Sequence, residues 1–162
     1  MTQPLFAMPS GCVTLSVVVA TDFDELVALR VAAMRDSLER IGRFDPERAH
    51  ERLHKSFYPE YTRFILLDGN RIGFYTFRPA DDGFHLDHLY VHPSCQSHGI
   101  GGNVMHHLLS QADACQMSVY LGALRRSASN RFHQRHGFVQ TTEGEWDIYY
   151  IRTPKPKAAS PP

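Results

Sequence analysis

The fold of this chain is decided by the stretch Val91-His92-Pro93-Ser94-Cys95-Gln96-Ser97-His98-Gly99-Ile100-Gly101-Gly102. Pro93 ends a segment that reads as a strand, and the glycines precede a helical pattern. Glycine has no Cβ, so the backbone can approach an anion closely, and the unpaired amides at a helix N-terminus carry partial positive charge. The stretch therefore predicts an anion-binding turn between a strand and a helix that begins near Gly101.

Several folds contain glycine clusters of this kind, and the neighbouring residues discriminate between them. A P-loop needs Lys-Ser or Lys-Thr after its last glycine, and neither pair follows Gly102. A dinucleotide-binding fold opens with a βαβ unit, whereas the strand before this turn belongs to a meander. On the glycines alone, a plain tight turn is the alternative that stays open.

Outward from the turn, periodicity and turn residues predict the order β-α-α-β-β-β-α-β-α-β-β. Strands are expected at 13–20, 63–67, 71–77, 84–91, 117–124 and twice within 138–151, and helices at 23–41, 46–57, from 101 onward and at 129–136. Such an order is typical of a mixed α/β domain whose central sheet is mostly antiparallel and flanked by helices. Only the crossover through the glycine-rich turn would be parallel.

Three local signals fix element ends. Thr21-x-x-Asp24 resembles a capping box at the start of the first helix. Asp45-Pro46 offers an N-cap and a first-turn proline to the second helix. Asp68-Gly69-Asn70 is a hairpin signal between two short strands.

Composition and net charge limit the number of domains and the classes of partner to be expected. The 162 residues are 43% hydrophobic, with 17 basic and 17 acidic side chains, so the formal net charge is zero. One domain over 12–152 is expected, with a flexible arm at 1–11 and a disordered Pro-rich tail at 153–162. Neutral charge favours neither nucleic acid nor a membrane surface as partner.

The cysteines and the N-terminus indicate a compartment. Cys12, Cys95 and Cys115 are odd in number and widely spaced, which favours a reducing environment and gives no zinc spacing. No secretory leader and no apolar run of membrane length is seen, so a cytoplasmic location is expected. The ten histidines give no closed ligand set, and no metal is expected.

Two segments carry a family resemblance. The stretch 91–102 resembles the Gln/Arg-x-x-Gly-x-Gly acyl-CoA motif of the GNAT N-acetyltransferase superfamily, and Leu89-Tyr90-Val91-His92-Pro93 is similar to the strand before it in that family. Phe132-His133-Gln134-Arg135-His136-Gly137-Phe138 resembles the family's Phe-Tyr-x-x-x-Gly-Phe signature. The element order agrees too, so the resemblance covers residues 13–152.

The resemblance implies acetyl-CoA as acyl donor. Backbone amides of the turn would bind its pyrophosphate, and its pantetheine arm would pair with the preceding strand. Arg126 stands where the family frequently has an asparagine that contacts CoA, so it either meets a CoA phosphate or belongs to a solvated basic surface. The residues expected to bind the cofactor are Tyr90, Val91, Gln96, Ser97, His98, Gly99, Ile100, Gly101, Gly102, Arg126 and Asn130.

The expected catalytic residues are His133, Asp87 and His85. His133 stands where the family often has a tyrosine that protonates the leaving thiolate, and an imidazole can donate that proton. A packing role is the alternative. His85 and Asp87 share one strand face by period-two alternation, and some family members place a basic carboxylate on this strand. Structural roles stay open for both.

The expected function is transfer of an acetyl or other acyl group from acetyl-CoA to a primary amine of a small molecule, directly within a ternary complex. The acceptor amine would lie near residues 34–61, as the resemblance implies. A non-catalytic acyl-CoA-binding module and a protein- or tRNA-directed acetyltransferase are the alternatives. Neutral charge argues against an RNA footprint. A homodimer is open, and neither nucleic acid nor membrane is expected as a partner.

Overall fold

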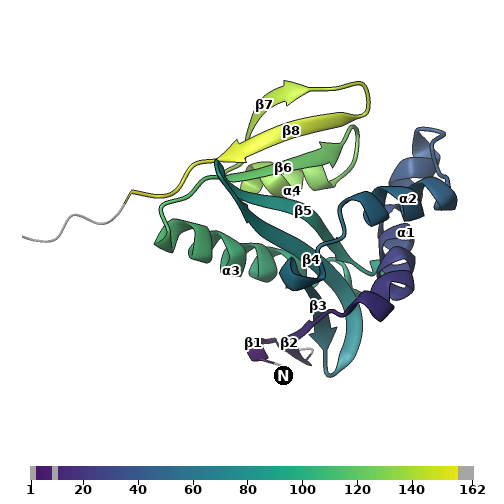
Figure 1. Ribbon diagram of the computed structural model, residues 1–162, viewed down its shortest axis with the longest axis horizontal. Helices are drawn as coiled ribbons and strands as arrows, with labels where there is room; N and C mark the ends of the chain where they lie inside the picture. Colours follow the sequence, from purple (N-terminus) through teal and green to yellow (C-terminus); the bar gives the residue numbers. More distant parts are fainter. Residues whose placement is uncertain (1–2, 9–10, 157–162) are drawn as a thin grey trace, which may run out of the picture. The chain divides into compact units, whose positions relative to one another are not determined.

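The computed structural model describes residues 3–8 and 11–156. Eight strands form one mixed sheet in the order β1-β2-β3-β4-β5-β6-β8-β7, and helices flank it (Figure 1). The chain divides into two compact units. The first unit comprises the described part of Met1–Phe77 together with Asp87–Asn103. The second unit comprises Arg78–Leu86 together with the described part of Val104–Pro162. The predicted mixed, mostly antiparallel α/β architecture is confirmed.

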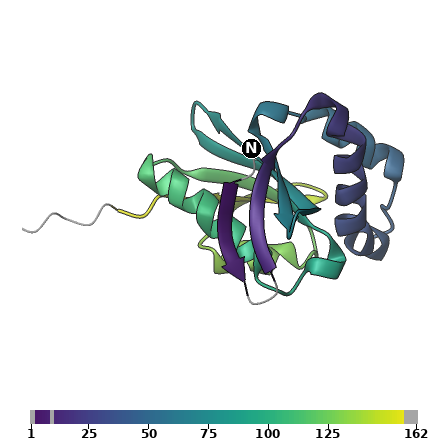
Figure 2. The ribbon, with the colours of Figure 1, turned by 90° about the horizontal axis from the view of Figure 1, so that it is seen from below.

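The first unit holds an antiparallel meander. Its strands are β1 (Gln3–Met8), β2 (Gly11–Val17), β3 (Thr62–Leu67), most of β4 (Asn70–Ala80) and the second half of β5 (Gly83–Val91). Strands β1 and β2 lie side by side (Figure 2). The sequence predicted a flexible arm where β1 lies. Pairing with β2 gives the β1 backbone its hydrogen-bond partners, and that information resides in the partner strand, outside the arm itself.

The hairpin between β3 and β4 forms as its residues predict. Asp68 and Gly69 have φ of 50° and 84°, and Leu67 pairs with Asn70 across the turn. Two successive residues with positive φ make a tight two-residue turn whose twist matches that of the strands. Asp68 also accepts a 2.9 Å hydrogen bond from the amide of Cys12, which ties the turn to β2.

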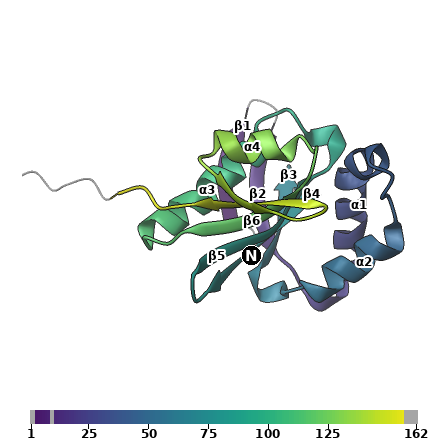
Figure 3. The same cartoon turned by 90° about the horizontal axis from the view of Figure 1, so that it is seen from above.

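Two helices cover one face of this meander. They are α1 (Phe23–Arg40), preceded by the short η1 (Ala20–Asp22), and α2 (Pro46–Lys55), which lies beside α1 (Figure 3). Asp45 caps α2 by accepting from the amides of Glu47 and Arg48, as predicted. The Thr21-x-x-Asp24 box is wrong: it is Asp22 whose carboxylate accepts from the amide of Val19, because η1 places the first turn earlier.

An apolar cluster joins these helices to the meander. Its buried members come from α1, α2, β3, β4 and the residue that follows β2, and they are Val18, Leu26, Leu29, Leu53, Phe64, Leu66 and Phe74. The half-buried Tyr90 of β5 packs against the same cluster. Burial of this apolar surface is the main force that holds α1 and α2 on the sheet.

The second unit holds the crossover and the C-terminal hairpin. Its elements are β6 (Val119–Leu124), α4 (Ser129–Arg135), β7 (Val139–Glu143), β8 (Asp147–Arg152) and most of α3 (Ile100–Ala114). Phe84 and His85 of β5 pair in parallel with Val119 and Tyr120 of β6, which confirms the predicted parallel crossover. Strand β8 pairs antiparallel with both β6 and β7.

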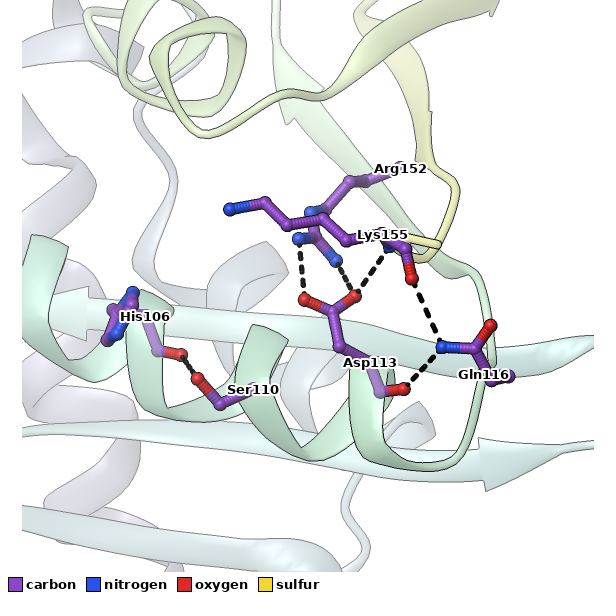
Figure 4. Close-up of polar contacts among 6 residues, drawn as sticks. All are labelled: His106, Ser110, Asp113, Gln116, Arg152 and Lys155. Carbon is purple, nitrogen blue, oxygen red and sulfur yellow. Dashed lines mark hydrogen bonds and ion pairs between the residues drawn. The ribbon is translucent and has the colours of Figure 1, made fainter. Parts of the chain in front are cut away.

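A partly buried ion pair ties the end of α3 to the end of β8. Arg152 donates from both terminal nitrogens to Asp113, at 2.7 and 3.0 Å (Figure 4). Asp113 also accepts from the amide of Lys155, and Gln116 donates to the carbonyl of Lys155 at 3.1 Å. The expected disordered tail thus begins with an anchored Lys155, and residues 157–162 lie outside the described part. In that part no helix is long and apolar enough to cross a membrane.

Candidate active site

The glycine-rich turn is an exposed loop that runs into α3. Ser97 and Gly99 both have left-handed backbone, with φ of 67° and 80°. The amide of Asn103 donates to the carbonyl of Gly99 at 3.1 Å, which is the first bond of the helix. The amides of Ile100, Gly101 and Gly102 come before that first donor, so helix geometry leaves them without an acceptor in α3. Unpaired amides at a helix N-terminus fit a pyrophosphate.

Side chains hold this loop in shape. Gln96 donates from its amide to the carbonyl of Val91 at 2.8 Å, which ties the loop to the end of β5. The ring nitrogen Nδ1 of His92 accepts from the amide of Ser94 at 3.2 Å and lies 2.7 Å from its hydroxyl. Cys95 donates its amide to the carbonyl of His92 at 2.8 Å. These hydrogen bonds restrict the conformations of the loop, which lowers the entropic cost of binding a ligand there.

Backbone contacts with β4 hold the end of β5. The amide of His92 donates to the carbonyl of Ile72 at 2.7 Å. A Cβ on Gly73 would collide with the carbonyl oxygen of Tyr90, so only glycine permits this approach. Tyr90 and Val91, both expected to contact the cofactor, thus lie on a strand end with little freedom to move.

A partly buried polar chain, defined as Arg30–Tyr90–His88–Ser56, runs beneath this strand end. Arg30 of α1 donates from Nε to the hydroxyl of Tyr90 at 3.3 Å. That hydroxyl lies 3.3 Å from Nδ1 of His88, and Nε2 of His88 lies 2.8 Å from the hydroxyl of Ser56. Ser56 in turn donates to the carbonyl of Arg52 at 3.1 Å. Arg30 and His88 are only 6% and 7% exposed.

His88 is neutral in this environment. Burial first, and then the nearby charge of Arg30, lower its pKa to about 3. No role for His88 is predicted from the sequence, although alternation already places it on the same strand face as Tyr90. Its partners could not be identified in that way, because Ser56 and Arg30 come from distant parts of the chain.

The two base candidates on β5 differ in their surroundings. Asp87 is half-buried. In the second unit, His85 pairs through Nε2 with Asp82 at 3.0 Å and stacks on the ring of Tyr120, with centroids 5.2 Å apart. The hydrogen bond with His85 lowers the pKa of Asp82. His85 is therefore already engaged with a carboxylate at the turn before its own strand.

His133 of α4 is buried among aromatic rings. Its ring centroid lies 5.4, 5.8 and 6.2 Å from those of Phe132, Phe138 and Tyr150. The side chain is 8% exposed, and its Nδ1 has no hydrogen-bond partner among the described residues. Burial first, and then His136, lower its pKa to about 4, so His133 is neutral at physiological pH.

Arg126 and Asn130 both precede His133 in the sequence. The amide nitrogen of Asn130 donates to the carbonyls of Leu124 and Ser127, and its oxygen accepts from Tyr150 at 2.8 Å. Its side chain thus fixes the β6–α4 connection. Arg126 is exposed and holds a positive φ of 64°, a strained conformation for a residue other than glycine.

The predicted residues divide between the two units. The first brings together the loop 96–102, the end of β5 and Asp87, and the second contains His85, Arg126, Asn130 and His133. Within residues 3–8 and 11–156, no group of three His, Cys, Asp or Glu side chains is placed to hold a metal ion. The groups that the predicted residues offer for acid–base chemistry are the carboxylate of Asp87 and imidazole rings, and backbone amides and the guanidinium of Arg126 are available to an anion.

Known proteins share this arrangement of elements. The fold is similar to that of the PaiA N-acetyltransferase from Thermoplasma acidophilum in complex with coenzyme A, at 13% identity and a TM-score of 0.70 over 87% of this chain and 98% of that one. It is also similar to an acetyltransferase from Thermus thermophilus, at 15% identity and a TM-score of 0.69 over 93% and 99%. The ribosomal-protein-S18-alanine N-acetyltransferase from Escherichia coli gives 16% identity and a TM-score of 0.66 over 91% and 97%.

Sequence comparison adds a family. No curated protein matches the chain. The family model of the acetyltransferase (GNAT) domain matches residues 59–140, just over half of the chain, and this segment contains β5, the glycine-rich loop, α3 and α4. The chain therefore belongs to the GNAT family of acetyltransferases.

Proposed function

We propose that this acetyltransferase transfers an acetyl group from acetyl-CoA to a primary amine of a small molecule, by direct attack within a ternary complex. The observation that carries the proposal is the loop Gln96–Gly102, with two left-handed residues and, at the start of α3, amides that have no acceptor within the helix. A PaiA N-acetyltransferase of similar fold is known in complex with coenzyme A.

The loop supplies the anion site. The amides of Gly99, Ile100, Gly101 and Gly102 bind the pyrophosphate, and the dipole of α3 adds favourable charge. The polar side chains of Ser97 and His98 are exposed beside it. Tyr90 and Val91 offer backbone groups to the pantetheine arm. Arg126, exposed on a strained loop, meets a CoA phosphate.

The thioester of acetyl-CoA supplies an activated acyl group. The acceptor nitrogen forms a bond to the acyl carbon as the carbon–sulfur bond breaks, and one proton leaves the nitrogen while the thiolate takes up another. We assign Asp87 as the base that accepts the amine proton, directly or through water, with His85 as the alternative. His133, neutral because burial lowers its pKa to about 4, donates a hydrogen bond from a ring N–H to the departing thiolate, and the thiolate takes its proton from water.

The acceptor lies near α1 and α2. Residues 34–61 combine acidic side chains with half-buried aromatic ones, Phe44, Phe57 and Tyr58. An ammonium group is recognised by carboxylates and aromatic faces. This supports a small amine as acceptor in preference to a nucleic acid, which would require a basic surface.

Calorimetric titration with acetyl-CoA tests the cofactor site. Wild-type protein is expected to bind in the micromolar range, and Gly99→Asp is expected to abolish binding because it adds a Cβ and a negative charge at the anion site. Gly69→Asp is the matched control, since Gly69 has φ of 84° against 80° for Gly99 and lies in the β3–β4 turn. Equal affinity of Gly99→Asp and Gly69→Asp would overturn the assignment.

The acceptor class is tested by CoA release. Small amines, an alanine-terminated peptide and aminoacyl-tRNA are supplied at equal concentration with acetyl-CoA. Turnover with a small amine is expected. Turnover with the peptide or tRNA alone would replace the proposed acceptor by a macromolecule, and binding without turnover on any amine would indicate a non-catalytic module.

A further inference from the structure

The partly buried polar chain has one consistent set of hydrogen bonds. A guanidinium only donates, so the hydroxyl oxygen of Tyr90 accepts from Arg30. A carbonyl only accepts, so the proton of Ser56 is directed to Arg52. Ser56 then has a lone pair for Nε2–H of His88, and Nδ1 of His88 accepts the proton of Tyr90. The protons of Tyr90, His88 and Ser56 each have an acceptor when His88 carries its proton on Nε2.

The other forms of His88 break this pattern. A proton on Nδ1 would be directed at a Tyr90 oxygen that already accepts from Arg30, and the tyrosine proton would lose His88 as its acceptor. The proton of Ser56 would have to turn from the carbonyl of Arg52 to Nε2. A doubly protonated ring would place a second positive charge beside the guanidinium of Arg30 in a buried site. Unsatisfied buried groups are unfavourable, so the neutral Nε2–H form dominates.

Backbone contacts also hold the strand end that carries Tyr90. The carbonyl of Tyr90 is pressed against Gly73, and the next backbone bond runs from His92 to Ile72. Gln96 of the anion loop reaches back to the carbonyl of Val91. The backbone of Tyr90–Val91 is thus fixed by β4 and by the loop, and its tyrosine side chain by His88 and Arg30.

We propose that His88 is a positioning residue for the acyltransferase. It holds the hydroxyl of Tyr90, and through that side chain it holds the strand end Tyr90–Val91, along which the pantetheine arm lies. Ser56 holds His88 in its Nε2–H form. This inference rests on the proposed function, since the cofactor contact of Tyr90–Val91 belongs to that proposal. His88 itself touches neither acetyl-CoA nor the amine.

The proton position is measured first. In ¹⁵N-labelled protein, two-bond ¹H–¹⁵N correlations of the His88 ring distinguish a protonated nitrogen from an unprotonated one. Wild-type protein at pH 7 is expected to show a protonated Nε2 and an unprotonated Nδ1. A proton on Nδ1 would overturn the proposal.

Ser56→Ala then tests whether the polar chain Arg30–Tyr90–His88–Ser56 affects the cofactor site. It removes the acceptor of Nε2–H without altering β5, so the His88 signals are expected to become a mixture of both neutral forms. Affinity for acetyl-CoA is expected to fall roughly fivefold, the equivalent of one ordinary hydrogen bond. Ser56→Thr keeps a hydroxyl and should restore both the Nε2–H signal and the affinity.

Ser110→Ala is the matched control. Ser110 makes the same kind of bond to the carbonyl four residues earlier, that of His106 at 2.8 Å, on the exposed side of α3 (Figure 4). Its affinity for acetyl-CoA should equal that of wild-type protein.

The outcomes separate the two proposals. Equal affinity of Ser56→Ala and Ser110→Ala would overturn the positioning role and leave the cofactor site standing. Failure of the wild-type protein to bind acetyl-CoA would overturn the proposed function, and the positioning role with it. A fivefold loss in Ser56→Ala together with the mixed ring signals would support both.

Discussion

Arg152 and Asp113 form a bidentate ion pair, with bonds of 2.7 and 3.0 Å between the last residue of β8 and the last turn of α3. The side chains are 7% and 24% exposed, so water screens this pair less than an exposed one. The hydrogen bond from Arg152 is the main cause that lowers the pKa of Asp113. The pair fastens the crossover helix to the C-terminal hairpin of the second unit.

Asp113→Asn is expected to lower the free energy of unfolding at pH 7 by about 2 kcal/mol, because it removes a charge-assisted pair and leaves Arg152 buried without its counter-ion. The carboxyl pKa is depressed on folding, so this stabilisation is present above the unfolded pKa of about 3.9 and is lost as pH falls through the folded value. Urea unfolding at pH 7 and pH 3 measures the difference. Asp36→Asn, on the exposed side of α1, should change stability little, and an equally small effect of Asp113→Asn would contradict the prediction.

Variants of His133 can distinguish a catalytic role of this residue from a packing role. His133→Phe keeps a ring among Phe132, Phe138 and Tyr150 and removes the unpaired Nδ1, so it should raise the free energy of unfolding by about 1 kcal/mol. If His133 donates a hydrogen bond to the departing thiolate, the same variant should lower the rate of CoA release by about 10²-fold, while His133→Tyr should retain activity. A fully active His133→Phe would leave His133 a packing role.

The same residue predicts a dependence of stability on pH. The pKa of His133 is lowered from 6.5 to about 4, so between these values the unfolded chain binds more protons and folding weakens as pH falls. Wild-type protein should therefore lose more stability than His133→Phe when urea unfolding is repeated at pH 7 and pH 5. His106→Phe, at an exposed position of α3, should behave as wild type does. Parallel losses in wild type and His133→Phe would count against a neutral, buried His133.

Gly73 is expected to be irreplaceable where β4 meets the end of β5. In Gly73→Ala the new Cβ would collide with the carbonyl oxygen of Tyr90, a backbone atom that cannot rotate away. Stability should fall by about 1–3 kcal/mol, and affinity for acetyl-CoA should fall with it. Gly122→Ala is the control, since its Cβ would meet mainly the side chain of Tyr149, at 3.2 Å. Thermal unfolding and calorimetry of both variants test this, and equal behaviour would refute it.

Arg126 combines backbone strain with a proposed phosphate contact. Arg126→Asn places a residue that tolerates positive φ at this position, so stability should stay level or rise by roughly a few tenths of a kcal/mol. Affinity for acetyl-CoA should nevertheless fall about tenfold at low salt and less at high salt, because one charge contact to phosphate is lost. Gln116→Asn, at another left-handed position with φ of 51°, controls for the backbone effect. Unchanged affinity of Arg126→Asn would leave Arg126 on a solvated surface.

Much of the fold follows from short stretches of sequence, because their physics is local. Asp68-Gly69 adopts positive φ at both residues and closes the β3–β4 hairpin. Asp45 caps α2 through amides two and three residues away. The glycine-rich loop precedes α3 as its composition predicts, and the element order places a parallel crossover there. These features depend on backbone freedom and neighbouring side chains, which a sequence displays directly.

Partnerships between distant residues were decided only by the tertiary structure. His88 meets Ser56, 32 residues away, Tyr90 meets Arg30, 60 away, and Arg152 meets Asp113, 39 away. Alternation along β5 shows which face of the strand His88 occupies and leaves open which helix residue packs against it. Strand β1 is a similar case, since an edge strand forms where a partner offers free backbone groups. The sequence by itself thus determined the family, the element order and the anion loop. The packing of α1 and α2 on β5 decided that His88 would be buried, neutral and hydrogen-bonded to Tyr90.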